Sequence, residues 1–264
     1  MDYGIAGKTA IVTGSTAGIG FAIATALARE GAQVVLNGRT QARIDEATEE
    51  LKRTVPGATV QGVPADLSTA AGCAAFVAAA PKAGILVNNM GIFEPKVFED
   101  IPDEDWQRMF EVNVMSGIRL ARHYLAGMKA AAWGRILFVS SESGVQIPEE
   151  MIHYGMTKTA QIAIARGLAE TCKQTGVTVN SLLVGPTRSE GVAVFVEELA
   201  KQNGMTTAEM ETDFFANARP TSLLQRFIEV DEVANMAAYL CSQAASATTG
   251  APIRVDGGVI RSAL

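Results

Sequence analysis

Residues 9–20 read TAIVTGSTAGIG, and this stretch decides the fold class of the chain. The apolar run Thr9–Val12 predicts a buried β-strand, and a glycine-rich turn separates it from a helix that reaches from about Ile19 to Arg29. Glycine at a strand end removes side chains, so backbone N–H groups and the following helix N-terminus can approach a pyrophosphate. The spacing is G-x-x-x-G-x-G, and such a turn can also serve packing alone. Its place after the first strand favours a phosphate loop.

The rest of the chain repeats this alternation of short apolar strands and helices. Thr40 and Asp231 are the expected N-caps of two of the helices. The pattern predicts an α/β fold, a single Rossmann-like domain over residues 1–264 with a doubly wound parallel sheet of about seven strands and helices on both faces. Further strands are expected at 33–36, 59–63, 85–87, 135–139, 177–184 and 252–255, and further helices at 41–55, 68–80, 103–129, 156–175 and 231–242.

Composition excludes several classes of partner. The chain has 264 residues, 48% of them hydrophobic, and a formal net charge of −6 without a Lys/Arg-rich run. This balance argues against nucleic acid or an anionic membrane as partner. Cys73, Cys172 and Cys241 are far apart and flanked by apolar residues, which indicates reduced core thiols and no metal site. No secretion signal or apolar run of membrane-spanning length is visible, so cytoplasmic residence is expected.

A second stretch, residues 141–158, reads SESGVQIPEEMIHYGMTK and carries the candidate chemistry. Tyr154 and Lys158 are four apart, so on a helix they share a face, and a fixed ammonium beside a phenol favours the phenolate. The hydroxyl of Ser141 can hold a carbonyl oxygen while the phenol protonates it. A solvated surface pair is the alternative for any isolated Y-x-x-x-K.

Further motifs stand in the same order along the chain: the glycine loop, Asn88-Asn89-Met90-Gly91 after the fourth strand, Asn113, Ser141, Tyr154 with Lys158, Gly185 and Asp256-Gly257-Gly258. Together they resemble the short-chain dehydrogenase/reductase family over about residues 7–258. The resemblance implies a general acid/base at Tyr154, with Lys158 lowering its pKa and holding the nicotinamide ribose. It implies a substrate-oxygen donor at Ser141, thirteen residues before the tyrosine, and a water-holding proton relay at Asn113.

The resemblance also implies a dinucleotide site. The expected cofactor-binding residues are Gly14, Ser15, Thr16, Gly18, Ile19, Gly20, Arg39, Asp66, Leu67, Asn89, Gly91, Tyr154, Lys158, Gly185 and Thr187. Asp66 is expected at the adenine, with capping of the helix from Ser68 as its alternative role. Thr187 is the first choice for the nicotinamide carboxamide, and Ser189 is the second.

The end of the second strand indicates which dinucleotide is preferred. The segment Leu36-Asn37-Gly38-Arg39-Thr40 has glycine where an acid would bind a ribose 2′-hydroxyl. Arg39 can pair with a 2′-phosphate, and Asn37 and Thr40 can add neutral donors. We therefore expect NADP, with NAD less favoured; Ala17, where many NADP-preferring members are basic, points the other way, and a solvated loop arginine is the alternative for Arg39.

A lid over the substrate is expected at about residues 187–224, called the lid segment below. It contains two helices broken at Asn203-Gly204, the second opened by Thr206 with Glu209. Its apolar side chains either cover the substrate or contact another subunit. The family resemblance implies a homo-oligomer, a tetramer or dimer.

We predict an NADP(H)-dependent oxidoreductase that interconverts a small-molecule carbonyl and a secondary alcohol, with a tyrosine as general acid/base. Alternatives are a 3-ketoacyl-acyl-carrier reductase, which would favour basic residues at the pocket mouth, and a non-catalytic nucleotide-binding regulator. The side chains expected to select the substrate are Glu142, Gln146, Glu149, Glu150 and His153.

Overall fold

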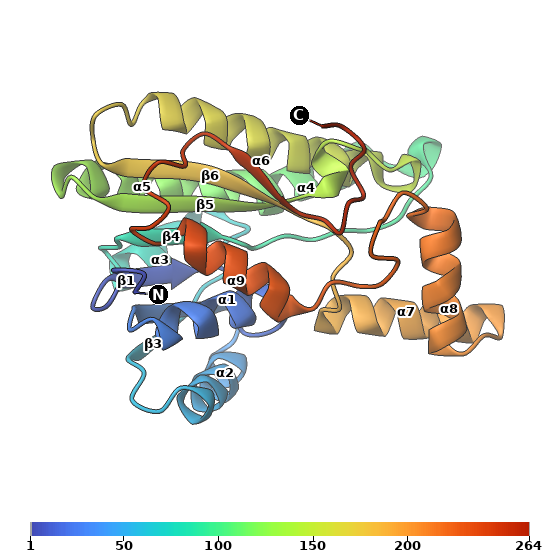
Figure 1. The fold of residues 1–264 in the computed structure, drawn as a ribbon, viewed down its shortest axis with the longest axis horizontal. Helices are drawn as coiled ribbons and strands as arrows, with labels where there is room; N and C mark the ends of the chain where they lie inside the picture. The colour runs from blue at the N-terminus through green and yellow to red at the C-terminus, as the bar shows by residue number, and fades with distance from the viewer. Residues whose placement is uncertain (1, 264) are drawn as a thin grey trace.

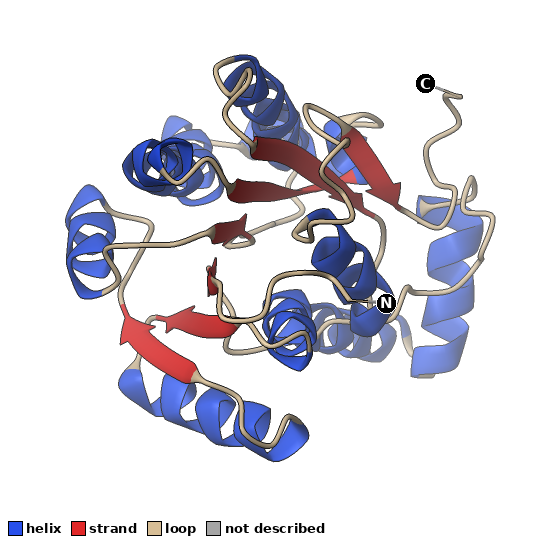
Figure 2. Cartoon of the chain, turned by 60° about the vertical axis from the view of Figure 1, so that its left-hand side comes forward, coloured by secondary structure: helices blue, strands red, loops and turns tan. Residues whose placement is uncertain are grey.

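Within residues 2–263, which the computed structural model describes, parallel strands form one sheet in the order β3-β2-β1-β4-β5-β6-β7 (Figures 1 and 2). The ends of the predicted domain, residues 1 and 264, lie outside the described residues. The strand order reverses between β1 and β4, which is where ligands bind in open parallel sheets. The strands are β1 (Thr9–Val12), β2 (Gln33–Gly38), β3 (Val60–Pro64), β4 (Ile85–Asn88), β5 (Gly134–Ser141), β6 (Val177–Val184) and β7 (Pro252–Val255).

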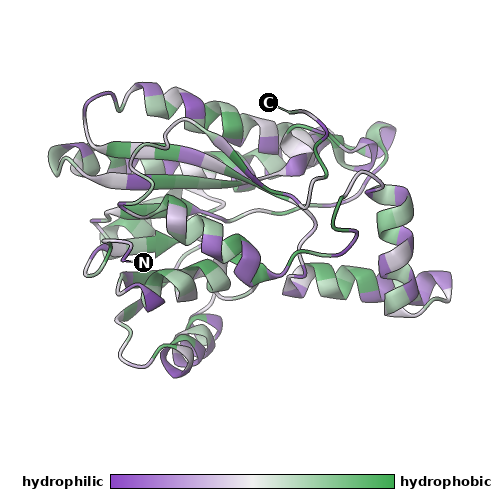
Figure 3. Cartoon of the chain, viewed as in Figure 1, coloured by the Kyte–Doolittle hydropathy of each residue, from purple (hydrophilic) through white to green (hydrophobic). Residues whose placement is uncertain are grey.

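Helices cover both faces of the sheet, as predicted. One apolar core joins α1, α2 and α9 to the strands, and the other joins α3, α5 and α6 to the opposite face. Figure 3 shows green along the central strands and purple patches on α2, whose outer side meets water. The helices are α1 (Gly18–Arg29), α2 (Gln41–Thr54), α3 (Ala70–Ala79), α4 (Asp103–Phe110), α5 (Ser116–Ala130), α6 (Ile152–Glu170), α7 (Glu190–Asn203), α8 (Thr207–Asp213) and α9 (Val230–Leu240).

Helices α7 and α8 stand beside the two layers, in orange at the right of Figure 1. They share a small core of their own with residues 214–227. The predicted break is confirmed, because Gly204 ends α7 in the left-handed conformation, with φ of 65°. The predicted capping box is also confirmed: Thr206 accepts from the Glu209 N–H, and Glu209 accepts from the Thr206 N–H.

The predicted limits of two helices are wrong. Helix α6 begins at Ile152, four residues before the expected start, because a 3-10 turn at 149–151 leads directly into it. It ends at Glu170 instead of 175, and Gln174 then turns the chain with φ of 61°. Helix α9 is capped by Glu229 instead of Asp231, and Glu229 forms a capping box with Glu232.

The predicted long helix at 103–129 is interrupted by a π-helical turn. Residues Glu111–Met115 form this wider turn between α4 and α5, and Asn113 is its central residue. Such turns occur often at functional sites because they redirect one side chain without ending the helix. The apolar periodicity of the sequence does not reveal it. None of the helices within 2–263 has both the length and the apolar character that crossing a membrane requires.

Candidate active site

The glycine loop after β1 is held by side chains from two neighbouring strand ends. The Thr13 hydroxyl accepts from the N–H groups of Asn89 and Met90, at 2.9 Å each. The Asn89 amide donates to the carbonyls of Thr13 and Gly14, at 2.9 and 3.1 Å. The Gly14 N–H donates to Asn37 Oδ1 at 3.2 Å. The loop therefore has a rigid path across the switch point between β1 and β4.

Three side chains near this loop form hydrogen bonds within the protein. The Ser15 N–H donates to the Asn37 carbonyl at 2.9 Å and the Ser15 hydroxyl to the Val12 carbonyl at 2.7 Å, so the hydrogens of the predicted cofactor ligand Ser15 are taken. Asn37 is buried, and its amide donates to the carbonyls of Val63 and Ala65. Thr40 accepts from Arg43 N as the N-cap of α2. The expected donor Asn37 is thus structural, whereas the Thr40 hydroxyl accepts in its cap and keeps its hydrogen to donate.

The loop fits the diphosphate of a dinucleotide. The N-cap position of α1 is Ala17, which supplies no side-chain acceptor, so the first N–H groups of the helix remain available to an anion. Gly14 and Gly18 have φ of 58° and 56°, where other residues are strained. A Cβ at Gly20 would lie 2.3 Å from the Gly14 carbonyl oxygen, so this close approach requires glycine.

The predicted adenosine end is more open. Arg39 follows β2 with an exposed side chain, and its positive charge contributes to a lowered pKa of Asp66, after hydrogen bonds from Ser68. Asp66 accepts from the Ser68 N–H, whereas Thr69 caps α3, so the expected capping role of Asp66 is confined to this turn. Leu67 is fully buried in the core, and only its main chain can reach a ligand.

A cavity of about 640 Å³ opens at the carboxyl ends of the strands. Its wall combines predicted catalytic and cofactor residues with apolar side chains of the lid segment. The predicted residues that line the cavity are Ile19, Asn89, Gly91, Ser141, Tyr154, Lys158, Gly185 and Thr187. The predicted residues that do not line it are Gly14, Ser15, Thr16, Gly18, Gly20, Arg39, Asp66, Leu67 and Asn113.

The predicted trio meets in this cavity. Ser141 is the last residue of β5, opposite Val184 of β6, and Tyr154 lies in the first turn of α6. Lys158 is buried one turn later, with Nζ 5.5 Å from the centre of the Tyr154 ring. Its ammonium donates to the Val139 carbonyl at 3.0 Å. A Cβ at Gly91 would lie 3.4 Å from Lys158 Nζ, so glycine leaves this side of the ammonium open.

Asn113 lies behind the trio in the π-helical turn. Its Oδ1 accepts from the Ile92 N–H at 2.8 Å, and its Nδ2 donates to the Ile92 carbonyl at 2.9 Å and to Thr157 Oγ1 at 3.0 Å. Gln161 donates to the Asn113 carbonyl at 2.6 Å. Asn113 thus braces the loop beside Lys158. Its predicted relay role stays a prediction, and Thr157 and Gln161 are supports that the sequence did not reveal.

The acid-base properties of the trio differ from the expectation. Burial raises the pKa of Tyr154, the negative charge of Glu142 raises it further, and Ser141 and Arg219 oppose the rise. Burial lowers the pKa of Lys158 to about 8, against the pull of Glu142. The Tyr154 pKa is thus raised where the sequence predicted a lowering, and the groups that oppose the rise are Ser141 and Arg219, not Lys158. At neutral pH the phenol is therefore a proton donor.

Glu142 and Arg219 are site residues that sequence reasoning underestimated. Glu142 was expected only among the side chains that select the substrate, yet just 4% of its surface is exposed. Its Oε1 accepts from Arg219 Nε at 2.9 Å, across 77 positions of sequence. No local pattern indicates this pairing, because it depends on how the lid segment returns to the sheet.

Beyond β6 the chain returns along the cavity. Gly185 pairs with β7 through its N–H, and the buried Thr187 hydroxyl donates to the Gly185 carbonyl at 2.9 Å. Ser189, the second choice for the carboxamide contact, caps α7 by accepting from Val192 N. Both hydroxyl oxygens can accept a further hydrogen bond and both residues line the cavity, so the choice of Thr187 stays a prediction.

His153, which was expected among the substrate-selecting side chains, does not line the cavity. His153 is fully buried, with its ring 5.9 Å from that of Trp106. Among the described residues, no group of three or more His, Cys, Asp or Glu side chains is arranged to hold a metal ion. Cys73, Cys172 and Cys241 are free and buried.

Comparison with known proteins identifies the family. The family model for short chain dehydrogenases matches residues 8–200. The uncharacterized oxidoreductase YvrD of Bacillus subtilis (strain 168) is 48% identical over 99% of this chain and 100% of its own length. D-beta-hydroxybutyrate dehydrogenase of Rhizobium meliloti (strain 1021) is 34% identical over 95% and 98%. L-sorbose reductase of Gluconobacter frateurii, solved with NADPH and L-sorbose, superimposes with a TM-score of 0.94 at 34% identity, covering 99% of this chain and 100% of that one. The predicted fold and oxidoreductase class are confirmed, and the chain belongs to the short-chain dehydrogenase family.

Proposed function

We propose that this protein is an NADP(H)-dependent oxidoreductase that interconverts a ketone and a secondary alcohol. The observation that carries the proposal is the convergence of Ser141, Tyr154 and Lys158 on one cavity next to the glycine loop. When bound, the nicotinamide supplies or takes the hydride. The alternative of a non-catalytic regulator gives no reason for a buried ammonium beside a half-buried phenol, because burying the ammonium is costly.

In the reduction direction the side chains divide the work. The Ser141 hydroxyl holds the carbonyl oxygen, and Tyr154 delivers a proton to that oxygen as negative charge develops on it. Lys158 holds the nicotinamide ribose and, with Asn113, passes a replacement proton towards the phenol. The raised pKa of Tyr154 supports its role as the acid, since the phenol keeps its proton at neutral pH.

The cavity supports a neutral, polar ketone as substrate. Apolar side chains of the lid segment line the cavity together with polar groups of Gln146, Glu149, Glu150 and Asn217. Arg219 also lines the cavity, but it is paired with Glu142 and Glu150, so Glu149 still disfavours an anionic keto acid and a ketoacyl group on a carrier protein, which would call for unpaired basic residues at the mouth. The hydroxyl groups of a neutral keto sugar can form hydrogen bonds with these polar side chains, and the related L-sorbose reductase is solved with such a sugar.

Three features support NADP over NAD. Arg39 is exposed at the end of β2, where a 2′-phosphate would lie, and residue 38 carries no acid. A Cβ at Gly38 would lie 2.6 Å from Thr16 Cγ2, so an acidic side chain there would have to push the Thr16 side chain aside. The related sorbose reductase is solved with NADPH.

The Tyr154→Phe variant tests the acid/base assignment. We expect turnover of a ketone or keto sugar with NADPH to fall about 10²–10⁴-fold, the usual contribution of a general acid. The measurement follows the nicotinamide absorbance over a panel of ketones, keto esters and sugars. Tyr239→Phe, on the exposed side of α9, is the matched control and should keep parent activity. A loss of less than tenfold in Tyr154→Phe contradicts the assignment.

The Arg39→Ala variant tests the cofactor. Loss of a charged hydrogen bond costs about 1.5–3 kcal/mol, so the Kd for NADPH should rise about 10- to 100-fold while the Kd for NADH stays the same. Fluorescence titration measures both constants, with the exposed Arg53→Ala on α2 as control. NADH binding as tightly as NADPH to the parent protein would refute the preference.

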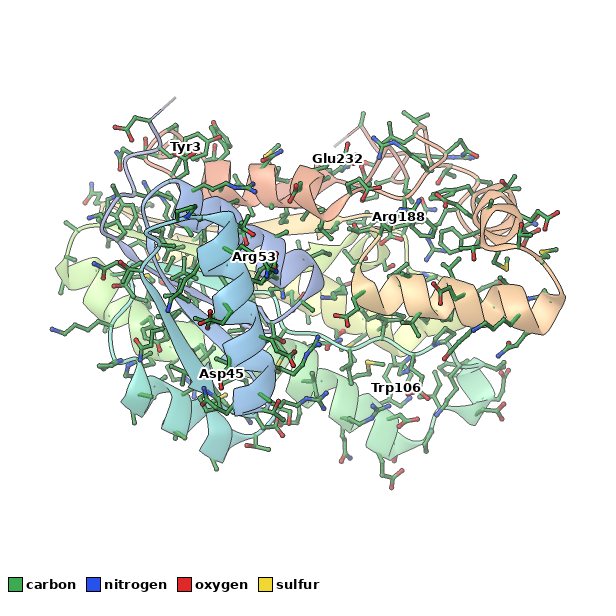
Figure 4. The ribbon with its side chains drawn as sticks, turned by 90° about the horizontal axis from the view of Figure 1, so that it is seen from below. Tyr3, Asp45, Arg53, Trp106, Arg188 and Glu232 are labelled. Carbon is green, nitrogen blue, oxygen red and sulfur yellow. The ribbon has the colours of Figure 1, made fainter. Side chains whose placement is uncertain are left out.

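We also propose that residues 187–224 form a lid. The separate core of α7 and α8 supports movement of this segment as a unit. Arg188, labelled in Figure 4, pairs with Glu211 at 2.8 Å and with Glu229 at 3.3 Å at the base of the segment.

We further propose that the protein is a cytoplasmic homo-oligomer, a tetramer or dimer. Light scattering during size-exclusion chromatography measures the oligomeric state, and a monomer would contradict this proposal.

A further inference from the structure

Glu142 directly follows Ser141 and turns its carboxylate back onto it. The carboxylate Oε2 accepts from the Ser141 hydroxyl, from Ser143 N at 2.6 Å and from the Ser143 hydroxyl at 2.9 Å. Residues 142–144 form a 3-10 turn, and all three are buried. A buried carboxylate is thus placed within hydrogen-bond reach of the group proposed to hold the substrate oxygen.

Arg219 compensates this buried charge from the far end of the lid segment. It follows the π-helical turn Phe214–Ala218, and only 8% of its surface is exposed. Its Nε donates to Glu142 Oε1 at 2.9 Å, and its Nη1 donates to Glu150 Oε1 at 3.1 Å. The guanidinium also lies 5.8 Å from the ring of Phe214. One arginine therefore connects the end of the lid segment with Glu142 and with the turn before α6.

The hydrogen of the Ser141 hydroxyl limits what this residue can do. A hydroxyl has a single hydrogen, and here it is given to Glu142, so Ser141 cannot at the same time donate to a carbonyl oxygen. The hydrogen must turn towards the substrate before reduction. When it turns, Glu142 keeps two donors from Ser143 and one from Arg219. The carboxylate stays paired in both states, so this rotation leaves no buried charge without a partner.

We propose that Glu142, held by Arg219, is a positioning residue that sets the direction of the Ser141 hydroxyl and couples it to the lid segment. The inference rests on the proposed oxidoreductase function. Glu142 acts through Ser141 and through its charge near the phenol, and Arg219 places that charge. A lid segment that moves away takes Arg219 with it, and the Glu142 charge beside the reacting groups is then uncompensated.

Glu142 and Arg219 shift the Tyr154 pKa in opposite directions, so the loss of each one should move this pKa in a different direction. The charged groups facing the phenol are Glu142 from the turn after β5, Lys158 from α6 and Arg219 from the lid segment. The negative Glu142 raises the Tyr154 pKa, and the positive Arg219 lowers it. A contact that only stabilises the fold predicts the same change when either partner is lost.

The experiment measures kcat for alcohol oxidation with NADP⁺ against pH. Oxidation needs the phenolate, so its rate rises with pH through an apparent Tyr154 pKa. We expect Glu142→Gln to move the midpoint down by about one pH unit and Arg219→Met to move it up by a similar amount. Glu142→Asp keeps the charge and should bring the midpoint back towards the parent value. Arg226→Met, which breaks the exposed pair with Glu232, is the control and should leave it unchanged.

Hydrogen exchange of α7 and α8 tests the coupling. Arg219→Met should speed exchange of these helices several-fold, and Glu142→Gln should speed it less, because Arg219 keeps its bond to Glu150 when the Glu142 charge is lost. Unchanged midpoints, or midpoints that move in the same direction, overturn the positioning role, and unchanged exchange overturns the coupling. If one variant does not fold, the sign of the shift in the other still decides. Failure of the parent to oxidise any alcohol would instead overturn the proposed function.

Discussion

At the scale of residues, the active site depends on neighbours in space that are distant in sequence. The residue types and spacing of Ser141, Tyr154 and Lys158 indicate their convergence, which the cavity confirms. Their ionisation could not be predicted in the same way. Burial and Glu142 govern the Tyr154 pKa, and burial follows from packing of the whole cavity. A spacing of four residues places two groups on one helix face and leaves their solvation open.

Lys158 should reduce the stability of the folded protein below about pH 8. Its pKa is lowered from 10.5 to about 8, so between these values the unfolded state binds more protons, and stability rises with pH. Below about pH 8 the full cost applies, which corresponds to about 3 kcal/mol for such a shift. We expect Lys158→Met to raise the free energy of unfolding at pH 7 by about 1–3 kcal/mol, because the lost bond to Val139 offsets part of the gain.

Urea unfolding at pH 7 and pH 10 measures this effect. The stabilisation should shrink towards pH 10, where most of the cost in the parent is lost. Lys173→Met replaces an exposed lysine and should change little at either pH. Equal stability of Lys158→Met and the parent at pH 7 would contradict the prediction.

At the scale of elements, local signals placed the helices but not all their limits. The Thr206 and Glu209 capping box and the stop at Gly204 are short-range chemistry, and both are confirmed. The start of α6 at Ile152 was missed because His153, Tyr154 and Gly155 are weak helix formers. They are helical because the turn packs against the sheet and α4, and packing overrides propensity.

Thr206→Ala should loosen α8 without unfolding the domain. Loss of an N-cap costs about 1 kcal/mol, which corresponds to about fivefold faster hydrogen exchange. The effect should be confined to α7 and α8, because these helices have their own small core. Mass spectrometry of exchanged peptides measures it. Thr212→Ala, in the same helix, removes only an exposed bond to Ala208 and serves as control. Equal acceleration in both variants would rule out the cap as the cause.

At the scale of the whole molecule, the two ends of the sheet differ in purpose. The carboxyl ends carry the glycine loop, Ser141 and the cavity. The amino ends carry Arg135, which is 2% exposed and donates to the carbonyls of Ser242, Gly134 and Gly176, at 2.9, 2.8 and 3.1 Å. This side chain connects the start of β5 with the turn before β6 and the end of α9.

Arg135→Met should therefore reduce stability and leave the site intact. Carbonyls that lose a donor in the interior cost about 1–3 kcal/mol each, which outweighs the relief of burying a charge without a carboxylate. We expect the free energy of unfolding to fall by about 2–4 kcal/mol, with the Kd for NADPH within twofold of the parent. Denaturant titration measures the first quantity and fluorescence the second. Arg53→Met, at the exposed position labelled in Figure 4, should change neither, and a rise in stability for Arg135→Met would show that charge burial dominates.

The sequence by itself determined the parallel sheet, the glycine loop and the trio of Ser141, Tyr154 and Lys158. Apolar runs, glycine and residue spacing act within a few positions, so their consequences can be read from the chain. Only the tertiary structure decided that Asn37 and Ser15 serve the loop, that Asn113 lies in a π-helical turn, and that Glu142 pairs with Arg219. Each of these depends on which groups become buried together, and burial is a property of the assembled layers.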